Sequence, residues 1–423
     1  MALAWRCLQH LELQRILKTD RAMKQYSEHN FEQCTKCTVC TVYCPVAAVN
    51  PLYPGPKQAG PDGQRLRMKG GEFFDESLNM CLNCKRCEVA CPSDVRIGDI
   101  IQSARIQYST KKPGLREFTL ANTDLVGSMA TLVSPVVNAT LGLKPVRHIV
   151  EGVMNIDHRR IFPKYAFGTF EGWMRKQRKA QAQFAKQIAY FHGCYVNYNN
   201  PPLGQAFVKV LNALGYGVQL LEKEKCCGVA LISNGFIDKA KKQAHSNLAS
   251  IRKATAAGLK VVATSSTCTF TLRDEYEHLL GIENGDVREN IDLACRFIYS
   301  LLSDGNHTLK FNPEAPRIRV AYHSPCHLER LGWTQYSIEL LKLIPNVDLV
   351  KLDSQCCGIA GTYGFKKENY ATSQAIGEPL FAAIEASECD YVATDCETCK
   401  WQIEMSTSKK VLHPIELLAN HLS

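Results

Sequence analysis

One spacing of cysteines occurs twice in this chain, and it constrains the fold more than any other feature. Residues 34–45 read C-T-K-C-T-V-C-T-V-Y-C-P, and residues 81–92 read C-L-N-C-K-R-C-E-V-A-C-P. Both runs follow the pattern C-x2-C-x2-C-x3-C-P. Three thiols that recur at every third residue of a tight loop can face a common point, whereas the fourth, after a longer spacing, points elsewhere. The two loops together therefore predict two centres of thiols.

Zinc sites and iron–sulfur clusters both use closely spaced cysteines. Structural zinc takes four ligands, commonly from two C-x2-C pairs, and has no use for a third cysteine at the same spacing. A disulfide framework is typical of small secreted domains, whereas this chain has 423 residues and no uninterrupted apolar stretch of signal-peptide length in residues 1–30. The pattern favours two 4Fe–4S clusters, and hence a protein that carries electrons.

In this pattern the fourth cysteine of each run binds the cluster of the other run. We therefore expect each cluster to take three thiolates from one run and one from the other. The first set is Cys34, Cys37, Cys40 and Cys91, and the second set is Cys81, Cys84, Cys87 and Cys44. Pro45 and Pro92 close the two loops, since proline offers no backbone N–H.

The sequence around the runs predicts a helical, ferredoxin-type domain over residues 31–110. Residues 73–80 and 94–108 have helical character. Residues 50–71, between the runs, are rich in proline and glycine and are expected to be a loop. Residues 1–30 are expected to be an N-terminal extension or a short amphipathic helix.

Residues 111–186 are interpreted as a basic linker or, alternatively, as a membrane-contact segment. Residues 125–143 carry no charge, but their serine, threonine, asparagine and proline content argues against a transmembrane helix. Residues 144–186 contain ten Lys or Arg against three Asp or Glu, which is typical of a surface for anionic lipid, nucleic acid or an acidic partner. We expect peripheral, electrostatic membrane attachment here, released by high salt or carbonate.

From residue 187 onwards, short apolar runs alternate with amphipathic segments, which is typical of parallel α/β sheets. The pattern repeats, and it predicts two Rossmann-like α/β lobes over residues 187–305 and 306–423. Every cysteine of the repeat directly follows a predicted strand, at the edge where open sheets place their ligands. The first lobe has Cys194, Cys226, Cys227 and Cys268, and the second has Cys326, Cys356, Cys357, Cys396 and Cys399.

The two lobes differ by one thiol, because Ser265 stands at the position that matches Cys396. Four thiolates suffice for a cubane cluster, and a fifth allows an opened, non-cubane cluster. We expect a cluster in the second lobe, and a cubane or nothing in the first. Three further cysteines fit no set of ligands: Cys7, Cys295 and Cys389. Three histidines flank the lobe cysteines: His192, His323 and His327. These histidines either tune a cluster through hydrogen bonds to sulfur or are ordinary residues.

These motifs resemble those of iron–sulfur subunits of anaerobic respiratory dehydrogenases, with glycolate oxidase and heterodisulfide reductase subunits among the relatives. The sequences P-G-P-K-Q-A-G-P-D at 54–62, S-S-T-C-T-F at 265–270 and D-S-Q-C-C-G-I-A-G-T-Y-G-F at 353–365 are similar to the family of the iron–sulfur, electron-transfer subunit of anaerobic glycerol-3-phosphate dehydrogenase. The resemblance runs from about Phe31 to the C-terminus.

The resemblance implies an electron-transfer and anchoring subunit with no substrate oxidation of its own. In the family, two flavoprotein subunits oxidise sn-glycerol 3-phosphate to dihydroxyacetone phosphate during anaerobic respiration. The iron–sulfur subunit then passes the electrons to a menaquinone-type quinone at the cytoplasmic face of the bacterial inner membrane. The resemblance also implies a non-cubane cluster on the five cysteines of the second lobe.

Two other classes of function stay open. A catalytic subunit of a glycolate-oxidase-like or heterodisulfide-reductase-like enzyme would do its chemistry at a cluster in the lobes. A nucleic-acid-binding protein with zinc knuckles is disfavoured, because the sequence has no aromatic platform and no known reading module. The sequence also has no G-x-G-x-x-G run after a predicted strand and no convincing Ser/His/Asp set.

Overall fold

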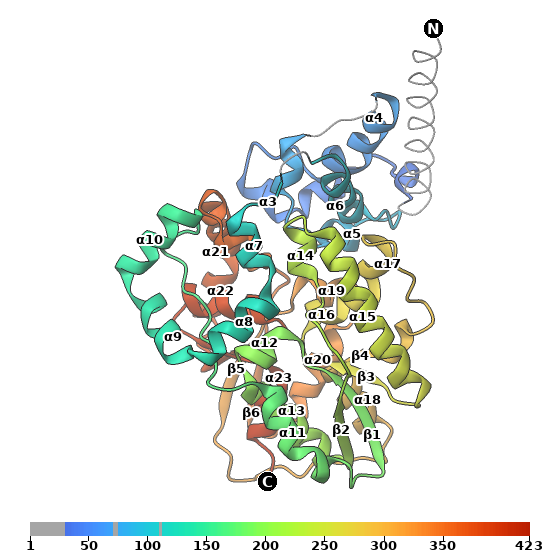
Figure 1. Ribbon diagram of the computed structural model, residues 1–423, viewed down its shortest axis with the longest axis vertical. Helices are drawn as coiled ribbons and strands as arrows, with labels where there is room; N and C mark the ends of the chain where they lie inside the picture. The colour runs from blue at the N-terminus through green and yellow to red at the C-terminus, as the bar shows by residue number, and fades with distance from the viewer. Residues whose placement is uncertain (1–29, 71–74, 110–111) are drawn as a thin grey trace. The chain divides into compact units, whose positions relative to one another are not determined.

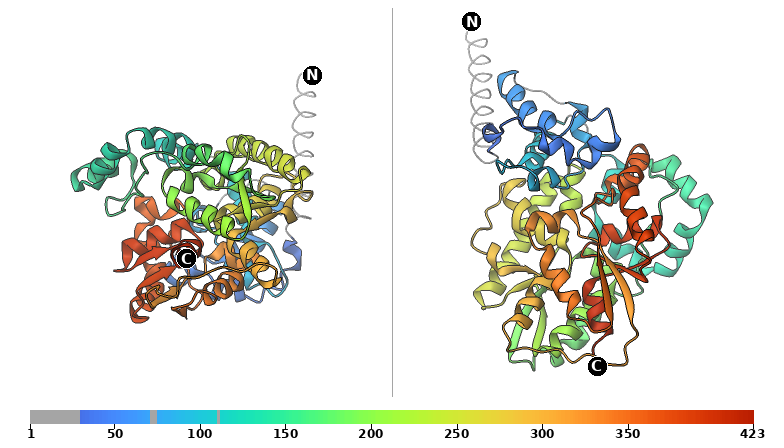
Figure 2. Two further views of the ribbon diagram at one scale, coloured as in Figure 1. Left: turned by 90° about the horizontal axis from the view of Figure 1, so that it is seen from below. Right: turned by 180° about the vertical axis from the view of Figure 1, so that it is seen from behind.

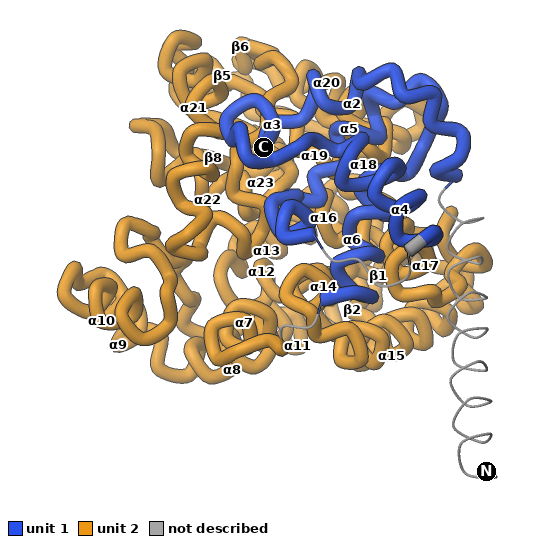
Figure 3. Tube along the Cα trace, turned by 90° about the horizontal axis from the view of Figure 1, so that it is seen from above, with its two compact units in different colours: residues 1–111 blue, residues 112–423 orange. Residues whose placement is uncertain are grey.

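The computed structural model describes residues 30–70, 75–109 and 112–423. The chain divides into two compact units, residues 1–111 and 112–423, which are coloured separately in Figure 3. The expected N-terminal extension, apart from Asn30, and Cys7 lie outside the described residues.

The described part of the first unit is helical, as the sequence predicts. The longest helix, α6 (Ile97–Tyr108), buries Ile97, Ile100, Ile101 and Ala104, which are spaced to share one helix face. The other elements are short: η1 (Phe31–Gln33), α2 (Val39–Val42), α3 (Pro45–Val49), η2 (Gln58–Asp62), α4 (Gly63–Gly70), η3 (Glu76–Met80) and α5 (Arg86–Val89).

The loop expected over residues 50–71 is wrong for its second half, because η2 and α4 make residues 58–70 helical. Pro61 lies inside this helical stretch, in the π-helical turn η2, and π-helical turns commonly occur as short bulges within helices. The buried Arg67 then ties the turns together, because it donates to Gln64 Oε1 (3.0 Å) and to the carbonyl of Ala59 (3.1 Å).

The second unit contains two parallel four-stranded sheets of the same topology (Figure 1), so the predicted repeat of α/β lobes is confirmed. The first sheet has the order β2-β1-β3-β4 and the second has the order β6-β5-β7-β8. The strands are β1 (Lys186–Phe191), β2 (Tyr216–Leu220), β3 (Val261–Ala263), β4 (Ile291–Leu293), β5 (Ile318–Tyr322), β6 (Val347–Lys351), β7 (Tyr391–Ala393) and β8 (Lys410–Leu412).

The two lobes share one hydrophobic core. Helix α13 (Pro201–Ala213) of the first lobe packs against α23 (Pro414–Asn420) of the second, and α18 (Ala294–Ser303) of the first packs against α20 (Thr334–Lys342) of the second. All four helices contribute to one buried apolar cluster. Because α13 matches α20 and α18 matches α23 in the repeat, the lobes pack with approximate twofold symmetry.

Further helices follow the strands in each lobe. In the first lobe they are α12 (Gly193–Tyr198), α14 (Val229–Ser233), α15 (Ile237–Ala256), α16 (Ser266–Phe270), η4 (Thr271–Glu275), α17 (Tyr276–His278) and η5 (Arg288–Asn290). In the second lobe they are α19 (Cys326–Leu331), η6 (Tyr363–Phe365), η7 (Lys367–Asn369), α21 (Tyr370–Ala386) and α22 (Glu397–Ser406).

The segment before the first strand is helical and belongs to the second unit. Its helices are α7 (Leu115–Ala121), α8 (Thr123–Leu132), α9 (Ser134–Gly142), α10 (Lys144–Met154) and α11 (Phe170–Gln181). Helix α7 packs on α14 and α8 packs on α12. Both views of Figure 2 show the teal segment with α9 and α10 at an outer edge of the second unit.

Membrane-spanning potential in this segment is limited to one bent pair of helices. Across the described ranges, no single helix has both the length and the apolarity needed to cross a bilayer. Helices α8 and α9 reach that length only together, and they meet at an angle of 103°.

Candidate iron–sulfur centres

The two cysteine runs of the first unit fold into loops with the same backbone twist. The residues two and four positions after the first cysteine are left-handed in both runs: Lys36 (φ 60°) and Thr38 (φ 66°), and Asn83 (φ 56°) and Lys85 (φ 63°). None of these residues is glycine, so each costs about 1–2 kcal/mol. Strain of this kind, repeated at matching positions, is typical of functional loops.

The second set of expected ligands lines one cavity. Cys44 from the first run lies there with Cys81, Cys84 and Cys87 from the second run. Burial, and then the charge of Cys84, raise the pKa of Cys44 to about 12, and burial also raises the pKa of Cys87. A cation bound among buried thiols stabilises their thiolate forms, so the thiols release their protons to solvent when the metal binds. The donors therefore fit the iron of a 4Fe–4S cluster.

The first set of expected ligands meets around Cys40. Burial raises the pKa of Cys40, and the nearby thiolates of Cys34, Cys91 and Cys37 raise it further. Cys91, from the second run, is thus near enough to Cys40 for their charges to interact, as are Cys34 and Cys37. The structure gathers the second predicted set of four thiols in one cavity, and it places Cys40 within electrostatic range of the other members of the first set.

In the first lobe the four cysteines form a row of thiols in contact. Cys194 contacts Cys226, Cys226 contacts Cys227, and Cys227 contacts Cys268. Thiol hydrogen bonds with Cys194 and Cys227 lower the pKa of Cys226. The row joins the ends of three strands, because Cys194 follows β1, the pair follows β2 and Cys268 follows β3.

The second lobe has a similar row, made by four of its five cysteines. Cys357 Sγ lies 3.3 Å from Cys399 Sγ, Cys356 contacts Cys357, and Cys396 contacts Cys399. Cys326 begins α19, the helix that follows β5. The turn after the cysteine pair needs glycine, because Gly358 has a φ of 85° and a Cβ there would lie 2.0 Å from the carbonyl oxygen of Ser373.

Ser265 holds the place of the fifth thiol in the first lobe. Ser265 is the N-cap of α16 and Cys396 is the N-cap of α22, so the two positions match in structure as well as in sequence. Ser265 Oγ accepts a hydrogen bond from the backbone N–H of Cys268 (3.1 Å) and donates to Glu397 Oε2 (2.9 Å). The serine hydroxyl is therefore engaged by the helix end and by a carboxylate of the second lobe.

A cavity between the lobes separates the two rows of thiols. Cys268 of the first lobe and Cys396 of the second both line it. Charged and titratable side chains complete much of the wall: His192, Glu397, Lys400, His413 and Glu416. The two thiol centres of the second unit are therefore neighbours across the twofold interface.

Sequence reasoning missed two carboxylates beside the first-lobe thiols. Asp124 of α8 accepts a hydrogen bond from the backbone N–H of Cys226 (2.9 Å), and burial, followed by the charge of Cys226, raises the pKa of Asp124 to about 6. No sequence signal points to Asp124, because it comes near Cys226 only through the packing of α8 on α12. Glu224 accepts from the backbone N–H of Gly193 (2.8 Å), and its place two residues before Cys226 could have drawn attention.

Both ring nitrogens of His192 have partners, among them the carboxylates of Glu224 and Glu171. Its ring lies 3.4 Å from Glu224 and 3.5 Å from Glu171, and Nδ1 lies 2.9 Å from the carbonyl oxygen of Gly193. Burial alone lowers the pKa of His192, but Glu224 and Glu171 outweigh it and raise the pKa to about 9. The ring nitrogens of His192 therefore already interact with these partners.

Two known protein families match this chain. A family described as a 4Fe–4S dicluster domain matches residues 30–95, and a family described as a cysteine-rich domain matches residues 188–273 and 320–404. The chain is therefore an iron–sulfur protein that combines a dicluster domain with two cysteine-rich domains.

More specifically, the chain belongs to the family of the C subunit of anaerobic glycerol-3-phosphate dehydrogenase. The protein of that name from Escherichia coli (strain K12) is 60% identical over 398 residues, which cover 94% of this chain and 100% of the relative. The B subunit of fumarate reductase (CoM/CoB) from Methanothermobacter marburgensis is 26% identical, with 89% of this chain and 69% of the relative covered. A probable glycolate oxidase iron–sulfur subunit of Bacillus subtilis is 26% identical, with 81% and 80% covered.

Proposed function

We propose that this chain is the electron-transfer subunit of an anaerobic sn-glycerol-3-phosphate dehydrogenase complex. The two flavoprotein subunits oxidise sn-glycerol 3-phosphate to dihydroxyacetone phosphate, with release of two electrons and two protons. This chain carries the electrons to a menaquinone-type quinone, which takes up two electrons and two protons. Identity of 60% over the whole length of the Escherichia coli relative supports the proposal.

The observation that carries the proposal is the assembly of complete thiol sets. In the first unit, Cys44 lines one cavity with Cys81, Cys84 and Cys87, and the charge of Cys91 acts on Cys40 as those of Cys34 and Cys37 do, which supports cross-ligation. When bound there, an iron–sulfur cluster accepts and donates single electrons. The protein supplies the thiolates, the burial around them and, across the cavity lined by Cys268 and Cys396, a close approach of the two lobe centres.

Anaerobic purification of the chain together with its flavoprotein subunits tests the proposal. Addition of sn-glycerol 3-phosphate should reduce the clusters of the chain, as seen by EPR, and a soluble menaquinone analogue should reoxidise them. A Cys84→Ser variant should still bind the flavoproteins but should transfer electrons more slowly. Clusters that stay oxidised in the intact complex after substrate addition would refute the proposal.

We propose further that residues 115–167 attach the chain peripherally to the cytoplasmic face of the bacterial inner membrane. Of the thirteen large apolar side chains that are exposed between residues 112 and 423, all except Leu343 lie in this stretch. Leu132 is 81% exposed and Phe167 is 85% exposed. Burying one such side chain in lipid is worth about 2 kcal/mol. The exposed residues of this apolar surface are Leu115, Phe118, Leu125, Met129, Leu132, Val133, Val136, Leu143, Ile149, Val153, Ile161 and Phe167.

Basic side chains accompany the apolar surface. Lys144, Lys164 and Lys176 are exposed, and each basic residue near an anionic membrane contributes about 1 kcal/mol. Arg160, which counts toward the basic segment in sequence, is buried and contributes no charge to the surface. The attachment therefore combines apolar insertion with charge, so high salt should weaken it without abolishing it.

Flotation with lipid vesicles tests the surface directly. Leu132→Asn should weaken binding to vesicles that contain anionic lipid by about tenfold or more, since 1.4 kcal/mol corresponds to a factor of ten. Leu343→Asn is the matched control, because Leu343 is exposed outside the apolar surface. Equal loss of binding in the two variants, or binding by neither wild type nor control, would contradict membrane attachment through residues 115–167.

A second candidate function is a reductase that acts in the cavity between the lobes. The presence of Cys268 and Cys396 in one cavity, together with Lys400 and His413, favours this alternative. Turnover of a disulfide substrate by the isolated, chemically reduced chain would support it. Loss of that turnover in Cys396→Ser, with the first-unit clusters intact, would place the reaction in the cavity.

A further inference from the structure

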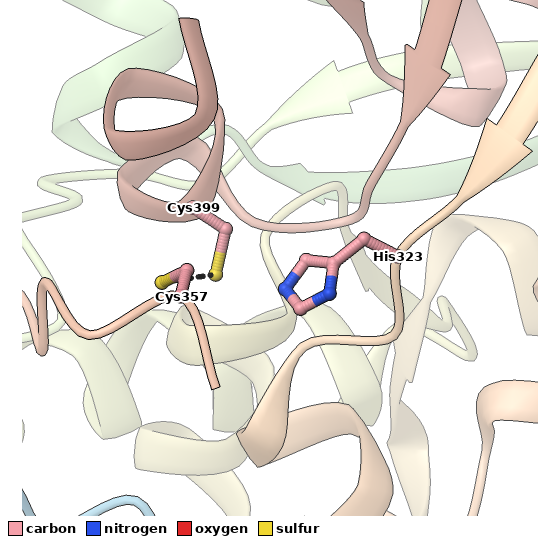
Figure 4. Close-up of side chains that lie close together, drawn as sticks. All are labelled: His323, Cys357 and Cys399. Atoms are coloured by element: carbon pink, nitrogen blue, oxygen red, sulfur yellow. Dashed lines mark hydrogen bonds between the residues drawn. The ribbon is translucent and has the colours of Figure 1, made fainter. Parts of the chain in front are cut away.

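His323 lies at the thiols of the second lobe, where its ring interacts with the sulfur of Cys357. The side chain is 1% exposed, and neither Nδ1 nor Nε2 has a nitrogen or oxygen hydrogen-bond partner. One ring nitrogen and the sulfur atoms of Cys357 and Cys399 all lie within 4.8 Å of one another. Figure 4 shows the ring facing Cys399, beside the contact between Cys399 and Cys357. Thiols form only weak hydrogen bonds, and a buried polar group that is poorly satisfied costs about 1–3 kcal/mol, so this arrangement needs a reason.

The sheet directs His323 toward the thiols. Its backbone N–H donates to the carbonyl of Ala393 (2.9 Å), which continues the pairing of β5 with β7. Successive side chains of a strand point to opposite faces. Tyr322 belongs to the core shared by the lobes, whereas Ala321 packs in the cluster that contains Cys357 and Cys399. His323 follows Tyr322 and shares the face of Ala321.

The first lobe has a phenylalanine at the matching position. Tyr190 and Tyr322 are equivalent, because their hydroxyl groups bond to matching residues. The hydroxyl of Tyr190 hydrogen-bonds Thr264 (3.0 Å), the residue before the N-cap of α16. The hydroxyl of Tyr322 donates to Asp395 (2.7 Å), the residue before the N-cap of α22. The residue that follows is Phe191 in the first lobe and His323 in the second.

Phe191 occupies the same surroundings as His323. A Cβ built on Gly193 would lie 3.9 Å from the ring of Phe191 and 3.4 Å from Cys268 Sγ, so the ring and the thiol flank one point. Cys268 is the counterpart of Cys399 in the repeat. The lobes therefore differ at two matching places near the thiols, Ser265 against Cys396 and Phe191 against His323. Both differences give the second lobe an additional metal donor.

We propose that His323 is a nitrogen ligand of the metal centre in the second lobe, which makes this centre a mixed cysteine–histidine site. The inference rests on the proposed iron–sulfur content of that lobe. Donor atoms within 4.8 Å of one another suit ligands that surround one ion at about 2.0–2.3 Å. Imidazole is an established ligand of iron, and in Rieske centres it replaces thiolate and raises the reduction potential.

Pulsed EPR on the full-length, anaerobically purified chain tests the assignment. The chain is produced with 15N-labelled histidine, and the signal of the second-lobe centre is identified by its loss in Cys399→Ser. We expect a strong nitrogen coupling that changes with the isotope. His323→Phe should remove this coupling while iron stays bound, because the first lobe shows that phenylalanine fits the position.

His327→Phe is the control for a neighbouring histidine. His327 follows Cys326, and its ring stacks on Phe270 with 4.8 Å between centroids. This variant should keep the nitrogen coupling, and loss of the coupling in His327→Phe alone would overturn the assignment of His323.

The outcomes separate this inference from the proposed function. A weak nitrogen coupling in the second-lobe signal would show that His323 donates a hydrogen bond to sulfur. This result would overturn the role of His323 as a ligand, but the evidence for the cluster would stand. If the iron content of Cys399→Ser equals that of the wild-type chain, the second lobe holds no cluster on Cys399, and both the cluster and the role of His323 are refuted. If His323→Phe does not fold, the isotope-dependent coupling of the wild-type chain decides between ligand and donor.

Discussion

Replacement of Ser265 by cysteine should give the first lobe the five thiols that the second lobe has. Ser265 and Cys396 cap matching helices, so the new thiol would start from the place that Cys396 occupies in the second lobe. A serine hydroxyl is a poor ligand for iron, whereas thiolate is the usual one. We expect Ser265→Cys to add a cluster to the first lobe or to convert a cubane there into the kind that the second lobe binds.

The substitution also has a cost that the structure allows us to estimate. The cap from Ser265 Oγ to the backbone N–H of Cys268 is worth about 1 kcal/mol. Loss of the hydrogen bond to the partly buried Glu397 costs roughly a further 1–3 kcal/mol. The metal-free protein should therefore lose about 2–4 kcal/mol of stability. Ser265→Ala is the matched control, because it loses the same two hydrogen bonds and supplies no thiol.

Iron and sulfide analysis with Mössbauer spectroscopy, performed anaerobically, compares the two variants. Ser265→Cys should hold about four more iron atoms per chain than Ser265→Ala, or the same iron with both lobes showing the spectrum of the second. Identical iron content and identical spectra in the two variants would refute the claim that the missing thiol distinguishes the lobes.

Three further results should follow from the packing of the second unit. Gly358→Ala should abolish iron binding in the second lobe, because its Cβ would lie 2.0 Å from a carbonyl oxygen. Gly228→Ala has 3.8 Å of clearance, so it should cost only the roughly 1–2 kcal/mol of a left-handed residue. Equal loss of iron in the two variants would contradict this expectation. Arg160→Met should lower the free energy of unfolding by about 3 kcal/mol, because it removes buried hydrogen bonds, including one to Ser373 Oγ (2.8 Å); a thermal melt equal to that of the wild type would count against it. Burial alone raises the pKa of Asp157, but hydrogen bonds from Arg159 outweigh burial and hold the pKa below its usual range. The stabilisation that Asp157 gives at neutral pH should therefore be lost as the pH falls through the lowered pKa. Proteolysis near residues 155–167 that does not accelerate in acid would contradict this expectation.

The cysteine positions could be read from the sequence because their information is local. Each run fixes its own loop, and each lobe cysteine directly follows a strand, so parallel pairing brings them to one sheet edge. The helical first unit and the repeated lobes follow from the same local patterns. The helical turns at 58–70 were missed, because the tie from Arg67 to Ala59 is not visible in composition.

Other features depend on contacts between distant residues, which one sequence does not reveal. Arg160 looks like part of a basic surface, but the fold buries it beneath the second lobe, with Tyr370 4.8 Å from its guanidinium. Asp124 reaches Cys226 only because α8 packs on α12. The difference between His192, which has acidic partners, and His323, which has none, also arises from tertiary packing.

We expect each cluster of the first unit to be held by cysteines from both runs. EPR of a Cys44→Ser variant, with Cys34→Ser and Cys81→Ser to assign the two signals, tests it most directly. Cys44→Ser should alter the signal that Cys81→Ser alters and leave the other unchanged, because Cys44 lines the cavity with Cys81, Cys84 and Cys87. A Cys44→Ser variant that instead alters the signal changed by Cys34→Ser would contradict the claim.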